Sequence, residues 1–168
     1  MKKIRRIKLA TLLIVGEGVH EKAFLQHMKS LYDSENNQAV KVDATSGGSP
    51  IEIIDETIRK FNHADYSRKV ILLDADVTIR QQDWDKARKN KIELIVSEPV
   101  CLEGMLLEVL GYKIPEFSSA TDCKKRLHAL LSGEPTRALS YASHFPKEVL
   151  DVVIKEQIVR LKNLICNK

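Results

Sequence analysis

Acidic side chains follow three apolar segments of this sequence at short distances. Glu17 and Glu21 come after the first segment, and Asp74 and Asp76 come after the second. Glu103 follows the third, where a helical pattern begins. Carboxylates bind divalent cations, and a site made only of oxygen ligands favours Mg²⁺ or Mn²⁺ over zinc. Five carboxylates gathered without a cation would repel one another, so the pattern predicts a metal site if the fold brings them together.

Each of these acids also has a simpler structural explanation when it is taken alone. An aspartate just beyond a strand, such as Asp76, is commonly a helix N-cap. Glu21 and Glu103 fall in the first turn of predicted helices, where the helix dipole favours a negative charge. The prediction of a metal site therefore depends on the three groups occurring together.

Apolar runs and helical stripes alternate along the first two thirds of the chain and place the acids at one edge of a sheet. We predict strands at residues 7–15, 39–45, 69–73 and 91–96, with helices at about 21–32, 50–62, 80–90 and 102–110. Strands that alternate with helices predict an α/β fold with a doubly wound parallel sheet. Sites in such sheets lie at the carboxyl ends of the strands, which is where the acids fall.

The last third of the chain is predicted to be helical. Helices are expected at residues 119–131, near 136–142 and at 147–166, the last with an apolar stripe of Val149, Val152, Val153, Ile158, Leu161, Leu164 and Ile165. In the helix at 80–90, Trp84 and Ala87 are the expected inward contacts. At 168 residues the chain is long enough for one domain. We expect an α/β core at 7–110 and a helical extension at 111–168 that packs on it.

Charge is distributed unevenly along the chain, and this predicts an anionic partner. Residues 1–118 hold 18 basic and 18 acidic residues, whereas residues 119–168 hold 9 basic and 5 acidic residues. A basic C-terminal third suits a polyanion. A second basic cluster near the N-terminus can contact phosphates or can simply be solvated; it consists of Lys2, Lys3, Arg5, Arg6 and Lys8.

Several other kinds of protein are disfavoured by the sequence. No apolar run approaches the roughly 20 residues of a membrane span, so we expect a cytoplasmic protein. Cys101, Cys123 and Cys166 are too widely spaced for a zinc motif and are expected to be free thiols. The five histidines show no metal-ligand spacing, and His20, although near the acids, is most simply a surface loop residue.

The loop at residues 46–50 precedes a well-marked helix start. Ser49 is the expected N-cap and Pro50 the first helical residue. Gly47 and Gly48 before a helix N-terminus can hold an anion, although a flexible connection with a good cap is the simpler interpretation.

Three motifs together resemble the TOPRIM domain, and more closely its branch in the OLD nucleases and RloB-like proteins. The first is the apolar run that ends in Glu17-Gly18-Val19-His20-Glu21, similar to the family's Glu-Gly-x-x-Glu. The second is Asp74-Ala75-Asp76, similar to its Asp-x-Asp. The third is Ser97-Glu98-Pro99 followed by Leu102-Glu103 and an apolar helix, which resembles the RloB-like pattern. The motifs occur in family order and cover residues 7–110.

The resemblance implies a TOPRIM-like, Rossmann-like fold and a role for each acid. Glu17 would be a metal ligand or the general acid/base, and Asp74 and Asp76 would bind a divalent metal. Glu21 and Glu103, with the region of Ser97, would complete a second metal position. The implied cofactors are therefore two Mg²⁺ or Mn²⁺ ions, and the implied catalytic residues are Glu17, Asp74 and Asp76.

The same resemblance implies a nuclease that cleaves or nicks nucleic acid, with DNA favoured over RNA. The OLD branch also uses a late lysine to stabilise transition-state charge, for which Lys124, Lys125 and Lys147 are candidates. No Gly-x-x-x-x-Gly-Lys-Ser/Thr motif occurs, so an ATPase would be a separate partner, as in some phage-defence systems. A homo-oligomer is compatible with this expectation, and no membrane partner is expected.

A regulatory or binding module is the alternative interpretation. It could be a TOPRIM-like domain without catalytic activity, or a phospho-receiver, since receivers also place acids after their first and third strands. A receiver needs an acidic pair after the first strand and a Lys-Pro after the fifth, and neither pattern occurs in this sequence.

Overall fold

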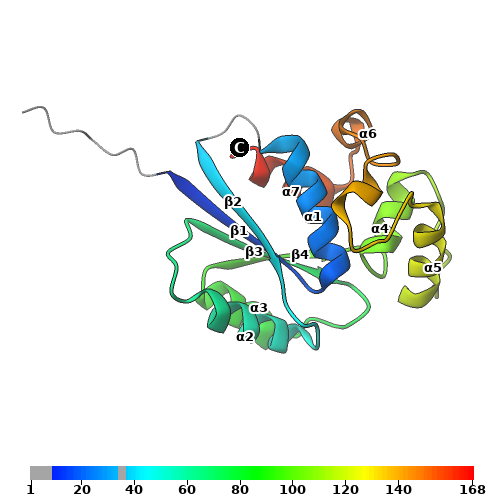
Figure 1. Cartoon of the computed structure of the whole chain (residues 1–168). Coiled ribbons are helices and arrows are strands. Elements are labelled where there is room, and N and C mark those ends of the chain that lie inside the picture. The colour runs from blue at the N-terminus through cyan, green and yellow to red at the C-terminus, as the bar shows by residue number, and fades with distance from the viewer. Residues whose placement is uncertain (1–8, 34–36) are drawn as a thin grey trace, which may run out of the picture.

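The four predicted strands form one parallel sheet in the computed structural model, which describes residues 9–33 and 37–168 (Figure 1). The strands are β1 (Ala10–Gly16), β2 (Gln38–Ala44), β3 (Arg68–Asp74) and β4 (Ile92–Ser97), in the spatial order β2-β1-β3-β4. All three strand pairs are parallel. The predicted α/β fold with a parallel sheet is therefore confirmed.

Alternate residues of the central strands point into two separate hydrophobic cores. Leu12 and Ile14 pack on one face of the sheet, and Leu13 and Val15 pack on the other. Both sets are buried, as expected for a parallel sheet covered on both faces. This double burial is the reason that the strand at β1 reads as a continuous apolar run.

Helices cover both faces, which gives three layers. The α2 (Pro50–Phe61) and α3 (Gln81–Lys89) helices lie on one face. The other face is covered by α1 (Val19–Tyr32), α4 (Leu102–Val109) and α7 (Glu156–Ile165), whereas α5 (Ala120–Leu130) packs against α4 at the side of the molecule (Figure 1). Apolar residues of α5 and α7 join the hydrophobic core on this side of the sheet. The predicted element boundaries agree with the structure to within about two residues up to residue 131, apart from the start of the first strand, which is predicted at a residue outside the described range.

The prediction of one long helix at 147–166 is wrong. The segment forms α6 (Lys147–Val152) and α7, because Val153 and Lys155 have extended backbone conformations. The β-branched residues around this break have low helix propensity. Val152, expected to face inward, is 78% exposed. The expected stripe is buried only within α7, where Ile158, Leu161, Leu164 and Ile165 pack on the core.

Two smaller expectations also differ from the structure. Trp84 is 36% exposed, whereas its neighbour Asp83 is fully buried because its carboxylate accepts a hydrogen bond from the Arg80 N–H at 2.8 Å. Ala87 is buried as predicted. The helix expected at 136–142 is a 3-10 helix, η1 (Ala138–Tyr141), with Tyr141 packed edge-on against Phe24.

Two features predicted from the sequence lie wholly or partly outside the described residues. The basic cluster at Lys2, Lys3, Arg5, Arg6 and Lys8 lies outside the described residues, as does the beginning of the strand predicted at 7–15. No helix in the described ranges is long and apolar enough to cross a membrane.

Candidate functional site

The carboxyl ends of the strands border a cavity of about 350 Å³. Its walls are residues 17–21 after β1, residues 45–47 after β2, Asp74 at the end of β3, and Lys124 of α5. These segments meet because all four strands are parallel and end at the same edge of the sheet. The cavity thus lies where the sequence places the site.

Glu17 is held at the junction between β1 and β3. Its N–H donates to the Leu72 carbonyl oxygen at 3.2 Å, and its Oε2 accepts from the Asp74 N–H at 3.0 Å. Burial raises the pKa of the Glu17 carboxyl, and the nearby charge of Asp76 adds to this effect. Glu17 is therefore fixed in position and is able to hold a proton closer to neutral pH than an exposed glutamate.

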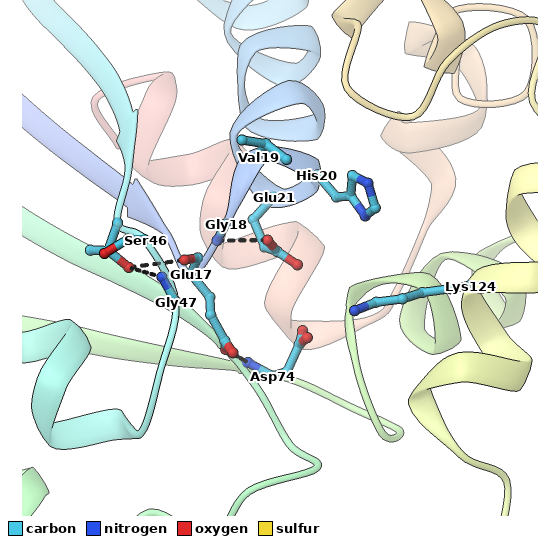
Figure 2. Close-up of a pocket in the computed structure, with 10 residues that line it drawn as sticks. Glu17, Gly18, Val19, His20, Glu21, Ser46, Gly47, Asp74 and Lys124 are labelled. Carbon is cyan, nitrogen blue, oxygen red and sulfur yellow. Dashed lines mark hydrogen bonds between the residues drawn. The ribbon is translucent and has the colours of Figure 1, made fainter.

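Glu21 both starts α1 and lines the cavity. Its Oε2 accepts a hydrogen bond from the Gly18 N–H at 2.8 Å, the reciprocal half of a capping box. Gly16 allows this approach, because a Cβ there would lie 2.5 Å from the Glu21 Cβ. The side chain is almost fully buried, and burial raises the pKa of its carboxyl. The helix-start role weighed from the sequence is real, and the carboxylate also faces the cavity (Figure 2).

Asp74 is the most perturbed acid of the group. It is 6% exposed, and its Oδ1 accepts a hydrogen bond from the Leu102 N–H at 2.9 Å. Burial, followed by the charge of Glu21, raises the pKa of Asp74 to about 8. Figure 2 shows the carboxylates of Asp74 and Glu21 and the ammonium group of Lys124 directed toward the same space.

This donor set suits a hard divalent cation. Glu17, Glu21 and Asp74 supply only oxygen atoms, and a cation would offset the repulsion that raises the pKa of Asp74. Ser97 pairs with Asp74 across β3 and β4, and its Oγ is buried without a hydrogen-bond partner among the described residues. An unpartnered hydroxyl beside the carboxylates is a further oxygen that a bound ion or its water could use.

Asp76 does not join this group. It lies in the turn beyond β3, is exposed to solvent, and does not line the cavity. The expectation that both aspartates turn toward one cation is therefore not supported by the arrangement of the side chains. The charge of Asp76 still acts on Glu17, so it lies beside the site on the solvent side.

Glu103 is fully buried in the first turn of α4 and contacts two histidines. Its Oε1 lies 3.2 Å from His20 Nδ1 and 3.3 Å from His128 Nε2. Burial by itself would raise the pKa of Glu103, but the hydrogen bond with His20 and the charge of Lys124 hold it below its ordinary value. The contact with Glu103 in turn raises the pKa of His20. Glu103 is close enough to act on Glu21, although it does not line the cavity.

Lys124 is the one of the three candidate lysines that lines the cavity. Burial alone would lower the pKa of Lys124. The nearby carboxylates of Glu103, Asp74 and Glu21 raise this pKa above its ordinary value, so the ammonium group stays charged. Lys125 lines a different surface hollow, and Lys147 pairs with Asp151 at 2.9 Å.

Basic charge near the cavity is concentrated on α5. Residues 124–126 of this helix are Lys-Lys-Arg. By contrast, five of the nine basic residues after 118 form ion pairs within the chain: Arg137, Lys147, Lys155, Arg160 and Lys162. The basic residues of this region without an ion pair given above therefore lie mainly on α5, where Lys124 faces the cavity and Lys125 and Arg126 line a neighbouring hollow.

The loop after β2 forms the helix start predicted from the sequence and also borders the cavity. Ser49 is the N-cap residue of α2, and its N–H and Oγ both donate to the Glu52 Oε2 at 2.7 Å, which is the glutamate half of a capping box. Gly47 and Gly48 have positive φ angles of 84° and 113°, which glycine adopts without strain. Residues 45–47 also form one wall of the cavity.

Sequence reasoning missed the role of the histidines. His20 and His128 are 108 positions apart, so no local motif could reveal them. One signal was available: Lys124 and His128 are spaced i, i+4 on a predicted helix and so share a face.

Comparisons with models of known protein families, with curated proteins and with solved structures find no match to this chain.

Proposed function

We propose that this protein is a Mg²⁺- or Mn²⁺-dependent phosphodiesterase of TOPRIM type that cleaves or nicks nucleic acid, DNA rather than RNA. The observation that supports it is the convergence of Glu17, Glu21, Asp74 and Lys124 on one cavity at the carboxyl edge of the sheet. Three acids and one lysine at a single cavity match the needs of phosphodiester cleavage, in which negative charge must be both approached and stabilised.

The acids divide into ligands and a proton carrier. Asp74 and Glu21 would hold the cations, with Ser97 close to Asp74. When bound, the cations would supply Lewis-acid chemistry at the phosphate. Glu17, whose pKa is raised by burial and whose position is set by the Asp74 N–H, is suited to take up or release a proton at the reacting oxygen.

The basic residues would bind the substrate. Lys124 places a positive charge at the cavity, where it would offset the charge that develops on the phosphoryl oxygens. The neighbouring exposed Lys125 and Arg126 extend this positive surface along α5 for the flanking phosphates. The separate ATPase partner and the role in phage defence rest on the resemblance to OLD and RloB-like proteins.

A cleavage assay tests the proposal directly. Supercoiled plasmid, linear duplex, single-stranded DNA and RNA would be incubated with the protein and Mg²⁺ or Mn²⁺. We expect cleavage that EDTA abolishes and that D74N lowers at least 100-fold. D65N is the matched control, because Asp65 is exposed near the opposite end of β3 and should leave the rate unchanged. Equal activity of wild type and D74N on every substrate would contradict the proposal.

The same variants separate the regulatory alternative from the nuclease. A receiver-like module would be labelled by acetyl phosphate at Asp74 and would cleave no substrate. In this structure the lysine at the cavity comes from helix α5 and not from a strand end, which favours the nuclease.

A further inference from the structure

Two histidines and one glutamate meet beside the cavity, at the interface of three helices. His20 comes from α1, Glu103 from α4 and His128 from α5. The three potential ligand atoms all lie within 4.8 Å of one another. The centroids of the two imidazole rings are 4.8 Å apart, the rings are nearly perpendicular, and one nitrogen of each ring contacts the same oxygen, Glu103 Oε1.

Two of the three distances within the cluster match those between ligands of a common metal ion, and the third, between the two imidazole nitrogens, is at most 4.8 Å. His20 Nδ1 and His128 Nε2 lie 3.2 Å and 3.3 Å from the same oxygen, Glu103 Oε1. Two ligands about 2.0–2.1 Å from a tetrahedral ion are separated by roughly 3.3 Å. Hydrogen bonds to a carboxylate are usually shorter, about 2.7–2.9 Å when charge-assisted.

Only one oxygen of the buried Glu103 carboxylate, Oε1, contacts the histidines. The Glu103 side chain has no solvent exposure, and its Oε2 has no hydrogen-bond partner among the residues that the structure describes. A buried carboxylate oxygen without a partner is costly. An ion at the cluster that was bound by both oxygens of this carboxylate would give Oε2 a partner as well.

We propose that His20, Glu103 and His128 bind one transition-metal ion, such as Zn²⁺ or Mn²⁺, in preference to Mg²⁺. Imidazole nitrogen suits these metals, whereas Mg²⁺ favours oxygen ligands. The site is separate from the oxygen-only position formed by Glu17, Glu21 and Asp74. It does not depend on nuclease activity, because the three ligands can hold an ion whether or not the chain cleaves nucleic acid.

The site would keep an open coordination position toward the cavity. Three protein ligands leave at least one position of a tetrahedral ion free. His20 lines the cavity, and the side chains of His20 and His128 are each 25% exposed, so water or a phosphate oxygen can reach the ion. Lys124, which acts on Glu103, stands on the same side and would favour an anionic ligand.

Metal titration without any substrate tests the site. Metal-free protein would be titrated with Zn²⁺ by calorimetry and with Co²⁺ by visible absorption, each in the presence of excess Mg²⁺. We expect one Zn²⁺ per chain to resist Mg²⁺, with affinity at least tenfold weaker in H20A, H128A and E103Q. H63A is the matched control, because His63 is exposed and far along the chain from the cluster, and it should bind as wild type does.

The outcomes separate this inference from the proposed function. Loss of Zn²⁺ binding in H128A but not in D74N would support the histidine site whatever the cleavage assay shows. Zn²⁺ binding that H128A leaves unchanged, or that Mg²⁺ displaces, would overturn it. An intense Co²⁺–thiolate charge-transfer band would place the ion at a cysteine and would also overturn it. Thermal melts of the metal-free variants would show that each one is folded.

Discussion

Asp74 should make the metal-free protein less stable as the pH rises. Its pKa is about 8 in the folded chain, against an ordinary value of 3.8. Between these values the folded state holds a proton that the unfolded state has released. The contribution of Asp74 to the free energy of unfolding is therefore largest below pH 3.8. This contribution falls as the pH rises toward 8.

The size of the effect follows from the linkage of one proton. The slope is about 1.4 kcal/mol per pH unit, so Asp74 alone would lower the free energy of unfolding by at most about 3 kcal/mol between pH 5 and pH 7. The raised pKa values of Glu17 and Glu21 act in the same direction. This is a large fraction of the stability of an ordinary domain, about 5–15 kcal/mol.

The substitution D74N isolates this contribution. An asparagine at this position carries no charge, and its Oδ1 can still accept the hydrogen bond from the Leu102 N–H. Urea unfolding in EDTA at pH 5, 6, 7 and 8 should show that D74N gains on the wild type as the pH rises, so the difference in the free energy of unfolding widens in favour of D74N between pH 5 and pH 7. D65N should follow the wild type throughout.

A cation should offset this gain of D74N at high pH. Saturating Mn²⁺ should stabilise the wild type at pH 8 much more than D74N, because only the wild type offers the carboxylate. Stability curves of wild type and D74N that run parallel from pH 5 to pH 8 would refute the placement of Asp74 in a buried cluster of acids.

Three further predictions follow from other contacts. G104A should lower the free energy of unfolding by about 1–3 kcal/mol in urea, since a Cβ at Gly104 would lie 2.3 Å from the Pro99 carbonyl oxygen; an unchanged midpoint would contradict this packing. K124A should reduce the cleavage rate at least tenfold, whereas K125A should mainly weaken substrate binding. Equal losses of turnover in the two variants would contradict a specific role of Lys124 in stabilising the transition state. Burial lowers the pKa of His27, so stability should fall as the pH drops below about 6.5, and H27Q should lose that dependence in thermal melts.

The sequence by itself determined the sheet and the edge at which the site lies. Continuous apolar runs such as 12–15 and 70–73 require a strand buried on both faces, which is a local property of composition and period. Once the strands are parallel, their carboxyl ends must meet, so Glu17 and Asp74 had to lie near each other. Capping signals such as Ser49 and Pro50 are equally local, and α2 begins where they predict.

Tertiary structure alone decided which side chains complete the site. Asp74 and Asp76 are two residues apart, but the first is buried at the strand end while the second lies in a turn and faces solvent. Contacts between α1, α4 and α5 bring His20 and His128 to Glu103, and no local pattern encodes an approach between residues so far apart. The break after Val152 likewise needed the tertiary structure: the low helix propensity of the β-branched residues allows a break there, but propensity alone is too weak to fix a helix end, and the packing of α7 on the core also contributes.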